Sequence, residues 1–356
     1  MLIGIPTEIK PQEGRVGLIP SACDELIRSG HKVFLQSGAG EISGYPDSEY
    51  AALGVEIVPD ARDVYALGEL IVKVKEPVAP ELDLLRPDHM LFSFLHLAAN
   101  RDLLQRLMQI GLTAIAFETV QDHGGLPILA PMSDIAGRLA LHHGVNLLFH
   151  SQGGRGMLLG GIPGTERGHV VVIGAGNAGS NAVRVAAQIG ARVTVFDKQY
   201  EKLASMSAIG SNVTALYPFP IKVAEAVADA DILVGAVLVP GAKAPHLVSA
   251  DQVESMRPGS VIVDIAVDQG GCIETTRATT YVAPTYKHAG VTHFCVTNIP
   301  GAVPRTASQA LSTALIPYVQ RLAAGGMASN KALQAGINVA DGHIVHAALK
   351  GLYPDE

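Results

Sequence analysis

The chain has 356 residues, of which 48% are hydrophobic and 38 are glycine, a length that predicts two domains rather than one core. Its formal net charge is −7 without long runs of one sign, which argues against nucleic-acid binding, because that function needs a basic patch. The three cysteines, Cys23, Cys272 and Cys295, show no CxxC spacing. We see neither a signal-peptide pattern nor an apolar run that could span a bilayer, so we expect a cytoplasmic protein without a membrane partner.

Short apolar runs alternate with helix-length segments along residues 1–128. The runs typical of strands are 2–6, 32–36, 55–58, 69–75, 90–95 and 112–117, and the segments typical of helices are 21–30, 46–54, 61–67 and 100–111. Alternation of this kind predicts a parallel sheet with crossover helices. Residues 1–128 therefore read as one complete α/β unit.

Two long helices are predicted on either side of a second α/β series. The first runs from about 132 to 151, with Ser133 or Met132 at its start, and the second covers 306–326 and is broken or ended near Pro317. His142, His143 and His150 lie on the first helix, where packing or interface roles outweigh metal binding, and we find no convincing metal site.

These elements predict an α/β fold with two doubly wound Rossmann-like domains joined by long helices and an active-site cleft between them. We expect a substrate domain of residues 1–128 plus about 306–356, with the tail returning to it, and a second domain of residues 129–305. Glycines at 153, 154 and 156 follow the first long helix and suggest a hinge.

A dinucleotide fingerprint opens the second domain. The apolar run 170–173 is followed at once by Gly174-x-Gly176-x-x-Gly179 and a helix-forming segment. Gly174 permits a tight turn, Gly176 lets the backbone approach a pyrophosphate, and Gly179 allows close helix–strand packing. A tight βα turn that binds nothing is the alternative interpretation.

The next predicted strand, 192–196, ends in Asp197, which can accept hydrogen bonds from an adenosine ribose. Its carboxylate would repel a 2′-phosphate, which favours NAD over NADP. The nearby Lys198 and Lys202 weaken this expected preference for NAD over NADP.

Candidate catalytic side chains follow several predicted strands. Arg15, Lys75 and His96 lie after strands of the first domain, and Asp268 and Asn298 after strands of the second. Ligands bind at the carboxyl ends of strands in such sheets. The Arg15 guanidinium can bind a carboxylate, the Lys75 ammonium can polarise a carbonyl, and the His96 imidazole can exchange protons. This set suits hydride transfer on a small 2-amino or 2-hydroxy acid.

Each residue also has a structural interpretation. The alternative for His96 is a satisfied structural histidine, for Lys75 a solvated strand end, and for Arg15 a surface charge. Lys73 is an equal candidate by composition, and the alternative for Asp268 is a cap on the turn that Gly270 and Gly271 make. Their shared position after strands makes coincidence less plausible.

The whole chain resembles the alanine dehydrogenase family, which is shared with the NAD-binding subunit of proton-translocating transhydrogenase. The stretches that carry this resemblance are "GIPTEIKPQEGRVGLIP", "IVKVKEP", "FSFLHLA", "APMSDIAGRLA", "QGGRGMLLGG", "VVIGAGNAG", "GAVLVPGAKAP" and "VIVDIAVDQGGC". It implies that Arg15 and Lys75 bind pyruvate or alanine, that His96 and Asp268 are the acid/base candidates, and that many members are homohexamers.

The resemblance also implies which residues contact NAD: Ser133, Asn177, Ala178, Asp197, Lys202, Val237, Leu238, Ile265, Asp268, Arg277, Asn298 and Ile299. Two departures stand out. This chain reads "YPFPIK" where relatives often carry a serine near the adenosine, and Ile299 stands where methionine is frequent.

The expected function is an NAD-dependent L-alanine dehydrogenase that converts L-alanine reversibly to pyruvate and ammonium with formation of NADH. One alternative is the transhydrogenase subunit, which resembles "FIWPA" where this chain has "FLHLA", so the presence of His96 favours the enzyme. The other is a non-catalytic NAD-binding protein, against which Arg15, Lys75 and His96 count.

Overall fold

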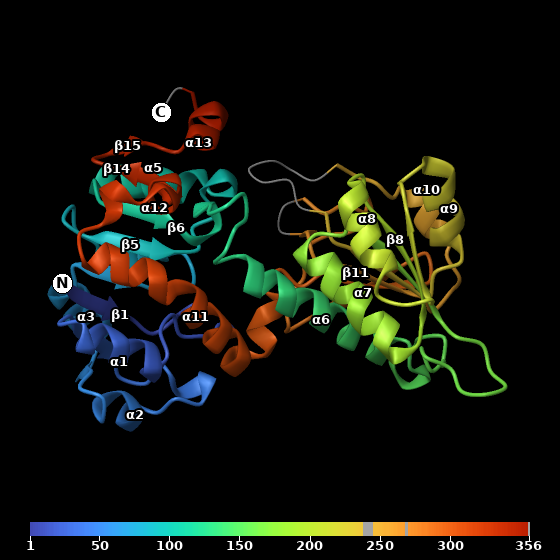
Figure 1. Cartoon of the computed structure of the whole chain (residues 1–356), viewed down its shortest axis with the longest axis horizontal. Helices are drawn as coiled ribbons and strands as arrows, with labels where there is room; N and C mark the ends of the chain where they lie inside the picture. Colours follow the sequence, from blue (N-terminus) through green and yellow to red (C-terminus); the bar gives the residue numbers. More distant parts are fainter. Residues whose placement is uncertain (238–244, 268–269, 355–356) are drawn as a thin grey trace. The chain divides into compact units, whose positions relative to one another are not determined.

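The computed structural model describes residues 1–237, 245–267 and 270–354. The chain divides into two compact units: unit 1 is Met1–Met132 with Gly301–Glu356, and unit 2 is Ser133–Pro300 (Figure 1). The chain therefore passes from one unit to the other after Met132 and after Pro300. Within the described residues, no helix has both the length and the apolar character needed to cross a membrane.

Unit 1 is built on an eight-stranded sheet with the order β15-β14-β6-β5-β4-β1-β2-β3. Its parallel strands are β1 (Leu2–Ile5), β2 (Lys32–Gln36), β3 (Glu56–Val58), β4 (Leu70–Val72), β5 (Met90–Ser93) and β6 (Thr113–Ala116). All six lie within the runs read as strands from the sequence. The tail adds β14 (Ile337–Ala340), antiparallel to β6, and then β15 (His343–Ile344). The C-terminal tail therefore contributes two strands to the sheet of unit 1.

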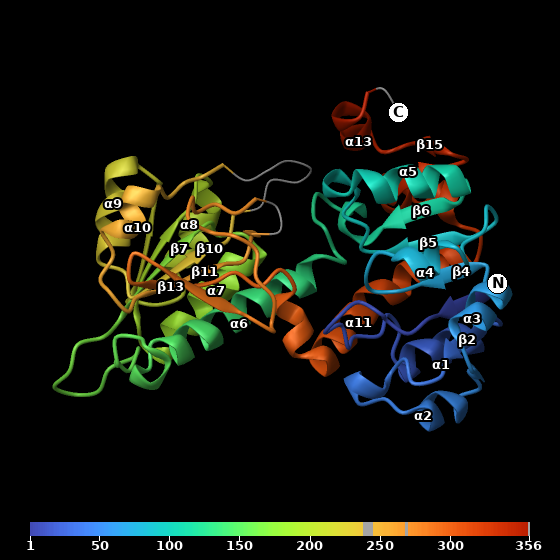
Figure 2. The ribbon, with the colours of Figure 1, turned by 180° about the vertical axis from the view of Figure 1, so that it is seen from behind.

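The helices of unit 1 are α1 (Pro20–Arg28), α2 (Asp47–Ala51), α3 (Ala61–Leu67), α4 (Ala79–Leu82), α5 (Arg101–Ile110), α11 (Pro304–Ala323), α12 (Lys331–Gly336) and α13 (Ala347–Leu352). Local chemistry sets their ends. At α5 the Asn100 side chain accepts a hydrogen bond from the backbone N–H of Leu103, and Gly111 ends the helix in the left-handed conformation. Figure 2 shows the C-terminal elements beside α5 and β6.

Helix α11 continues through Pro317, so the predicted break there is wrong. Proline removes one backbone hydrogen bond, but the residues after it, Tyr318, Val319 and Leu322, are buried. Their packing holds the helix together, as tertiary contacts often do against local propensity. Helix α11 also lies wholly within unit 1. The chain crosses from unit 2 to unit 1 after Pro300, which is before this helix begins.

Unit 2 is a doubly wound sheet with the order β12-β13-β11-β10-β7-β8-β9. Its parallel strands are β7 (His169–Ile173), β8 (Arg192–Phe196), β9 (Val213–Leu216), β10 (Ile232–Gly235), β11 (Val261–Asp264) and β13 (Val291–Phe294), and β12 (Thr285–His288) is antiparallel. The chain order reverses between β7 and β10, which is the switch point where ligands bind in such sheets.

The helices of unit 2 are α6 (Ala130–Leu147), which begins at the end of unit 1, α7 (Asn177–Ile189), α8 (Tyr200–Ser207), α9 (Pro220–Ala228) and α10 (Ala250–Glu254). Helices α9 and α10 lie side by side in both views (Figures 1 and 2). Two groups of buried apolar side chains pack the two faces of this sheet, because successive strand residues such as Val170 and Val171 belong to different groups.

The predicted glycine hinge is wrong. Gly153, Gly154 and Gly156 lie inside unit 2 rather than at a passage between units. A Cβ atom on Gly154 would stand 2.1 Å from the carbonyl oxygen of Leu147, so this glycine allows close packing against the end of α6.

Candidate functional site

The carboxyl ends of three neighbouring strands of unit 1, β1, β4 and β5, precede the predicted substrate residues. Arg15 follows β1, Lys75 follows β4 and His96 follows β5, and these strands are parallel. Their following segments therefore leave from the same edge of the sheet. Neither Lys75 nor His96 is the last residue of its strand, because β4 ends at Val72 and β5 at Ser93.

Arg15 is buried, with 3% of its surface exposed, so it is not a surface charge. Its Nε and one terminal nitrogen donate to the two carboxylate oxygens of Glu13 at 2.7 and 2.5 Å. The other terminal nitrogen lies 3.4 Å from the sulfur of Met132. A bidentate pair of this kind fixes the plane of the guanidinium, which is the preorganisation that carboxylate recognition requires.

Lys73 and Lys75 have different surroundings and therefore different roles. Lys73 is buried, and its Nζ lies 3.4 Å from Oε2 of Glu8 and 3.0 Å from Oε1 of Glu81. A buried cation that is paired with two carboxylates has a structural role. Glu8 also accepts the backbone N–H groups of Val74 and Lys75, at 2.5 and 3.2 Å. The buried charges thus hold the backbone at Lys75.

Lys75 is half-buried, and its ammonium forms no salt bridge with any described residue. Burial lowers the pKa of Lys75, and the neighbouring positive charge of Arg15 lowers it further. An anion that binds beside both cations relieves their repulsion. This arrangement favours Lys75 over Lys73 as the group that meets a substrate carboxylate or carbonyl.

His96 lies in a turn after β5 with a left-handed backbone, at φ 50°. Its side chain is 36% exposed, and its ring stacks on that of Phe94 with 5.8 Å between centroids and 3° between planes. A ring that is held by one face and open to solvent is available for proton exchange, which a fully buried structural histidine is not. The geometry favours the catalytic interpretation.

Glu118 is a functional candidate that the sequence reasoning missed. It follows β6, the next parallel strand, and its Oε1 accepts the backbone N–H of His96 at 2.6 Å. The same oxygen lies 3.9 Å from Nδ1 of the His96 ring. The signal was present, because Glu118 comes directly after the apolar run 112–117, just as the other candidates follow theirs.

The glycine-rich turn of unit 2 has the geometry of a dinucleotide cradle. Gly174 has φ 98°, and a Cβ atom on Gly179 would stand 1.8 Å from the carbonyl oxygen of Gly174. A Cβ atom on Gly176 would meet no atom within 4 Å, so its surroundings are open. Helix α7 starts at Asn177, next to Ala178, without a side-chain cap. Its first N–H groups therefore have no partner within the helix and can bind a phosphate.

Asp197 directly follows β8, and only 12% of its side chain is exposed. Its two carboxylate oxygens accept the backbone N–H groups of Ala175, at 2.8 Å, and Gln199, at 2.9 Å. Nζ of Lys202 lies 3.8 Å from Oδ2 of Asp197. Because a carboxylate offers about four acceptor positions, the ribose hydroxyls can still bind beside these N–H groups. The side chain thus ties the glycine turn to the strand that follows it.

The other predicted cofactor residues follow the strands of unit 2. Two of the predicted residues, Leu238 and Asp268, lie outside the described residues. Ile299 is buried in the core, and Arg277 is exposed, with its guanidinium 4.2 Å from the ring centroid of Tyr286. The remaining positions are Val237 after β10, Ile265 after β11, Asn298 after β13 and Ser133 in the first turn of α6.

Asp264 binds described backbone groups that follow β11 in the sequence. It ends β11, is fully buried, and accepts the backbone N–H groups of Ala266 at 3.0 Å and Cys272 at 3.2 Å. The Thr276 hydroxyl donates to it at 2.7 Å, and burial raises its pKa. One carboxylate therefore holds the backbone at both Ala266 and Cys272.

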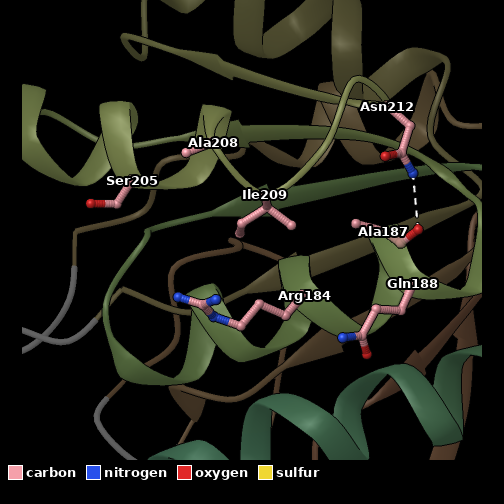
Figure 3. Close-up of a pocket in the computed structure, with 7 residues that line it drawn as sticks. All are labelled: Arg184, Ala187, Gln188, Ser205, Ala208, Ile209 and Asn212. Atoms are coloured by element: carbon pink, nitrogen blue, oxygen red, sulfur yellow. Dashed lines mark hydrogen bonds between the residues drawn. The ribbon is translucent and has the colours of Figure 1, made fainter.

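The described residues offer no metal centre. They contain no group of three or more His, Cys, Asp or Glu side chains placed to hold a metal. A pocket between α7 and α8 is lined by Arg184, Ala187, Gln188, Ser205, Ala208, Ile209 and Asn212 (Figure 3). It lies toward the ends of these helices that are remote from the glycine turn, and it contains none of the predicted site residues.

Comparisons with known proteins show to which family the chain belongs. The profile of the family described as "Alanine dehydrogenase/PNT, N-terminal domain" matches residues 4–136, and that of the C-terminal domain matches residues 140–347. The protein named alanine dehydrogenase from Mycolicibacterium smegmatis is 49% identical, over 98% of this chain and 96% of its own length.

Two solved structures extend the comparison. One named L-alanine dehydrogenase is 49% identical with a TM-score of 0.96, and the match covers 100% of this chain and 99% of that one. A transhydrogenase from Sinorhizobium meliloti is 26% identical with a TM-score of 0.85, and the match covers 98% and 100% of the two chains. By its sequence, its fold and the extent of these matches, the chain belongs to the alanine dehydrogenase/PNT family.

Proposed function

We propose that the chain is an NAD-dependent L-alanine dehydrogenase. The reaction converts L-alanine, water and NAD⁺ into pyruvate, ammonium, NADH and a proton, and it runs in both directions. Relatives that are named for this activity support the proposal over nearly their whole length. The observation that carries it is the half-exposed His96 at the sheet edge that also carries Arg15 and Lys75, because such a set suits acid/base work on a small amino acid.

The substrate groups have distinct roles in this proposal. Arg15 binds the carboxylate, and the Lys75 ammonium polarises the carbonyl or imine carbon. Bound NAD supplies the hydride acceptor for the hydrogen on Cα. Water then adds to the resulting imine, and the carbinolamine loses ammonia to give pyruvate. His96 takes a proton from the attacking water and returns one to the leaving nitrogen. Asp268 is the other acid/base candidate, and Asn298 contacts substrate or cofactor.

NAD is proposed to bind along the switch-point edge of unit 2. The turn at Gly174, Gly176 and Gly179 and the start of α7 receive the pyrophosphate, because the surroundings of Gly176 are open and the first N–H groups of α7 have no side-chain cap. Asp197 receives the adenosine ribose and disfavours NADP, and Lys202 approaches the same carboxylate. Residues 133, 237, 238, 265, 277, 298 and 299 complete the proposed contacts. Because Ile299 is buried, its contact is the least supported of these.

The domain roles follow from this division. Unit 1 binds the substrate and unit 2 binds the cofactor, and the expected cleft between them stays a prediction. The homohexamer and the cytoplasmic location also stay predictions, and light scattering coupled to size-exclusion chromatography measures the first. The transhydrogenase alternative has less support, because the solved transhydrogenase is 26% identical whereas the L-alanine dehydrogenase is 49% identical.

The direct test mixes the purified protein with NAD and L-alanine and follows the absorbance of NADH. We expect NADH, pyruvate and ammonium in equal amounts, and the reverse reaction from pyruvate, ammonium and NADH. His96→Ala is expected to lower turnover roughly 10²–10⁴-fold while NADH affinity and the melting temperature stay nearly unchanged. If the wild-type protein forms no NADH with L-alanine, the proposed function is wrong. A lower melting temperature with near-normal turnover in the variant would instead move the proton chemistry to Asp268.

A further inference from the structure

The turn that carries His96 is held from both sides. On its amide side, both oxygens of Glu118 lie 3.3 Å from the backbone nitrogen of Leu95, and Oε1 lies 2.6 Å from that of His96. On its carbonyl side, the Tyr353 hydroxyl donates to the carbonyl oxygen of Ala98 at 3.0 Å. The two leucines that flank His96 are buried in one apolar cluster.

This support matters because the backbone of His96 is unusual. A residue other than glycine with φ near 50° is strained, and such residues persist only where the surroundings over-determine them. The carboxylate of Glu118 satisfies two consecutive N–H groups that the turn points in one direction. A neutral or shorter side chain would hold this conformation less firmly, because hydrogen bonds to an ionised acceptor are stronger.

The same carboxylate oxygen also faces the imidazole. Oε1 of Glu118 lies 3.9 Å from Nδ1 of His96, which is ion-pair distance, and catalytic hydrogen bonds are often long before the substrate binds and become shorter in the complex. The stacking on Phe94 keeps the ring plane nearly fixed. With Nδ1 directed at a carboxylate, Nε2 is the nitrogen left for the substrate, and the charge that forms when His96 accepts a proton is stabilised.

We propose that Glu118 is a positioning residue that acts through His96. This rests on the proposed function, in which His96 moves protons between water, substrate and the leaving nitrogen. Glu118 itself does not touch the substrate. It holds the turn in its left-handed conformation, orients the imidazole, and compensates the positive charge that His96 carries after it takes a proton.

The test is a double-mutant cycle that combines Glu118→Gln with His96→Ala. The glutamine retains an oxygen for the backbone N–H groups and removes the charge. We measure turnover, KM for L-alanine, NADH affinity by fluorescence and the melting temperature for all four proteins. Glu118→Gln should lower kcat roughly 10–10²-fold, the loss typical when a carboxylate that orients a functional histidine is removed. KM and NADH affinity should change little.

The His96→Ala background separates positioning from a general structural role. If Glu118 acts through His96, Glu118→Gln causes no further loss of the residual turnover there. Equal loss in both backgrounds, or normal kcat with a lower melting temperature, would overturn the proposal. Full turnover in His96→Ala alone would instead show that His96 carries no proton chemistry, so that the two failures are distinguishable.

Two more variants complete the design. Glu118→Asp retains the charge at a shorter reach and should recover part of the kcat that Glu118→Gln loses; no recovery would argue against a role of the charge. Tyr353→Phe removes a support on the other side of the same turn without changing the charge near Nδ1, so its kcat should fall less than that of Glu118→Gln. An equal fall would mean that turn rigidity alone explains the effect. If Glu118→Gln does not fold, Glu118→Asp is measured in both backgrounds with the same criteria.

Discussion

Two neighbouring glycines of the fingerprint should respond in opposite ways to the same added methyl group. Gly176 has φ −71°, which any residue adopts, and its Cβ would meet no atom within 4 Å. Gly179→Ala would place a Cβ 1.8 Å from the carbonyl oxygen of Gly174, which is backbone and cannot move aside cheaply. We therefore expect Gly176→Ala to change ligand binding and Gly179→Ala to change stability.

The magnitudes follow from these surroundings. Overpacking by one methyl group costs about 1–3 kcal/mol, so Gly179→Ala should lower the melting temperature by several degrees. Gly176→Ala should leave it nearly unchanged or slightly raised, because alanine reduces the entropy of the unfolded chain. The methyl group would, however, occupy the space that the pyrophosphate approaches. Loss of one charged hydrogen bond, about 1.5–3 kcal/mol, weakens NADH binding roughly 10–10²-fold.

The assay is a thermal melt and an NADH fluorescence titration on the wild type and both variants. Normal NADH affinity in Gly176→Ala would refute the assignment of this turn as the pyrophosphate site. A melting temperature of Gly179→Ala equal to that of the wild type would refute the packing argument.

Three further predictions use the charged groups. Asp197→Asn should weaken NAD binding and improve the relative use of NADP, because it removes a charge but keeps an acceptor for the N–H of Ala175; an unchanged preference in kcat/KM would count against the assignment. Binding of pyruvate to the NADH complex should weaken as pH rises through the pKa of Lys75, which burial and Arg15 hold below the ordinary 10.5, and a flat profile up to that value would contradict this. Burial lowers the pKa of His293 from 6.5 to about 4, so the unfolded chain binds more protons than the folded chain between these pH values. The contribution of this group to the free energy of unfolding, about 3 kcal/mol, is therefore lost as pH falls from 6.5 toward 4. His293→Gln should make the melting temperature depend less on pH in this range.

Local patterns predicted what depends on neighbours in the sequence. The run at 170–173 and the three glycines after it specify a strand, a turn and a helix start, and the structure places each of them there. The six parallel strands of unit 1 were found by the same reasoning, because a buried strand is a short apolar run between turn residues.

Features that depend on distant residues were not predictable in this way. Strand β14 pairs with β6 so that Ile337 lies opposite Ile115, and the sequence of neither strand specifies with which strand it pairs. Lys73 and Lys75 are equivalent in the sequence, and only the carboxylates of Glu8 and Glu81 tell them apart. The continuation of α11 through its proline likewise depends on packing that the local pattern does not contain.

The central claim is that this chain transfers a hydride directly from Cα of L-alanine to NAD. The most direct measurement uses L-alanine that carries deuterium on Cα, with mass spectrometry of the reduced cofactor and of the pyruvate. We expect one deuterium on the nicotinamide ring of each NADH formed. Reduced cofactor without deuterium, or no reduced cofactor at all, would contradict it.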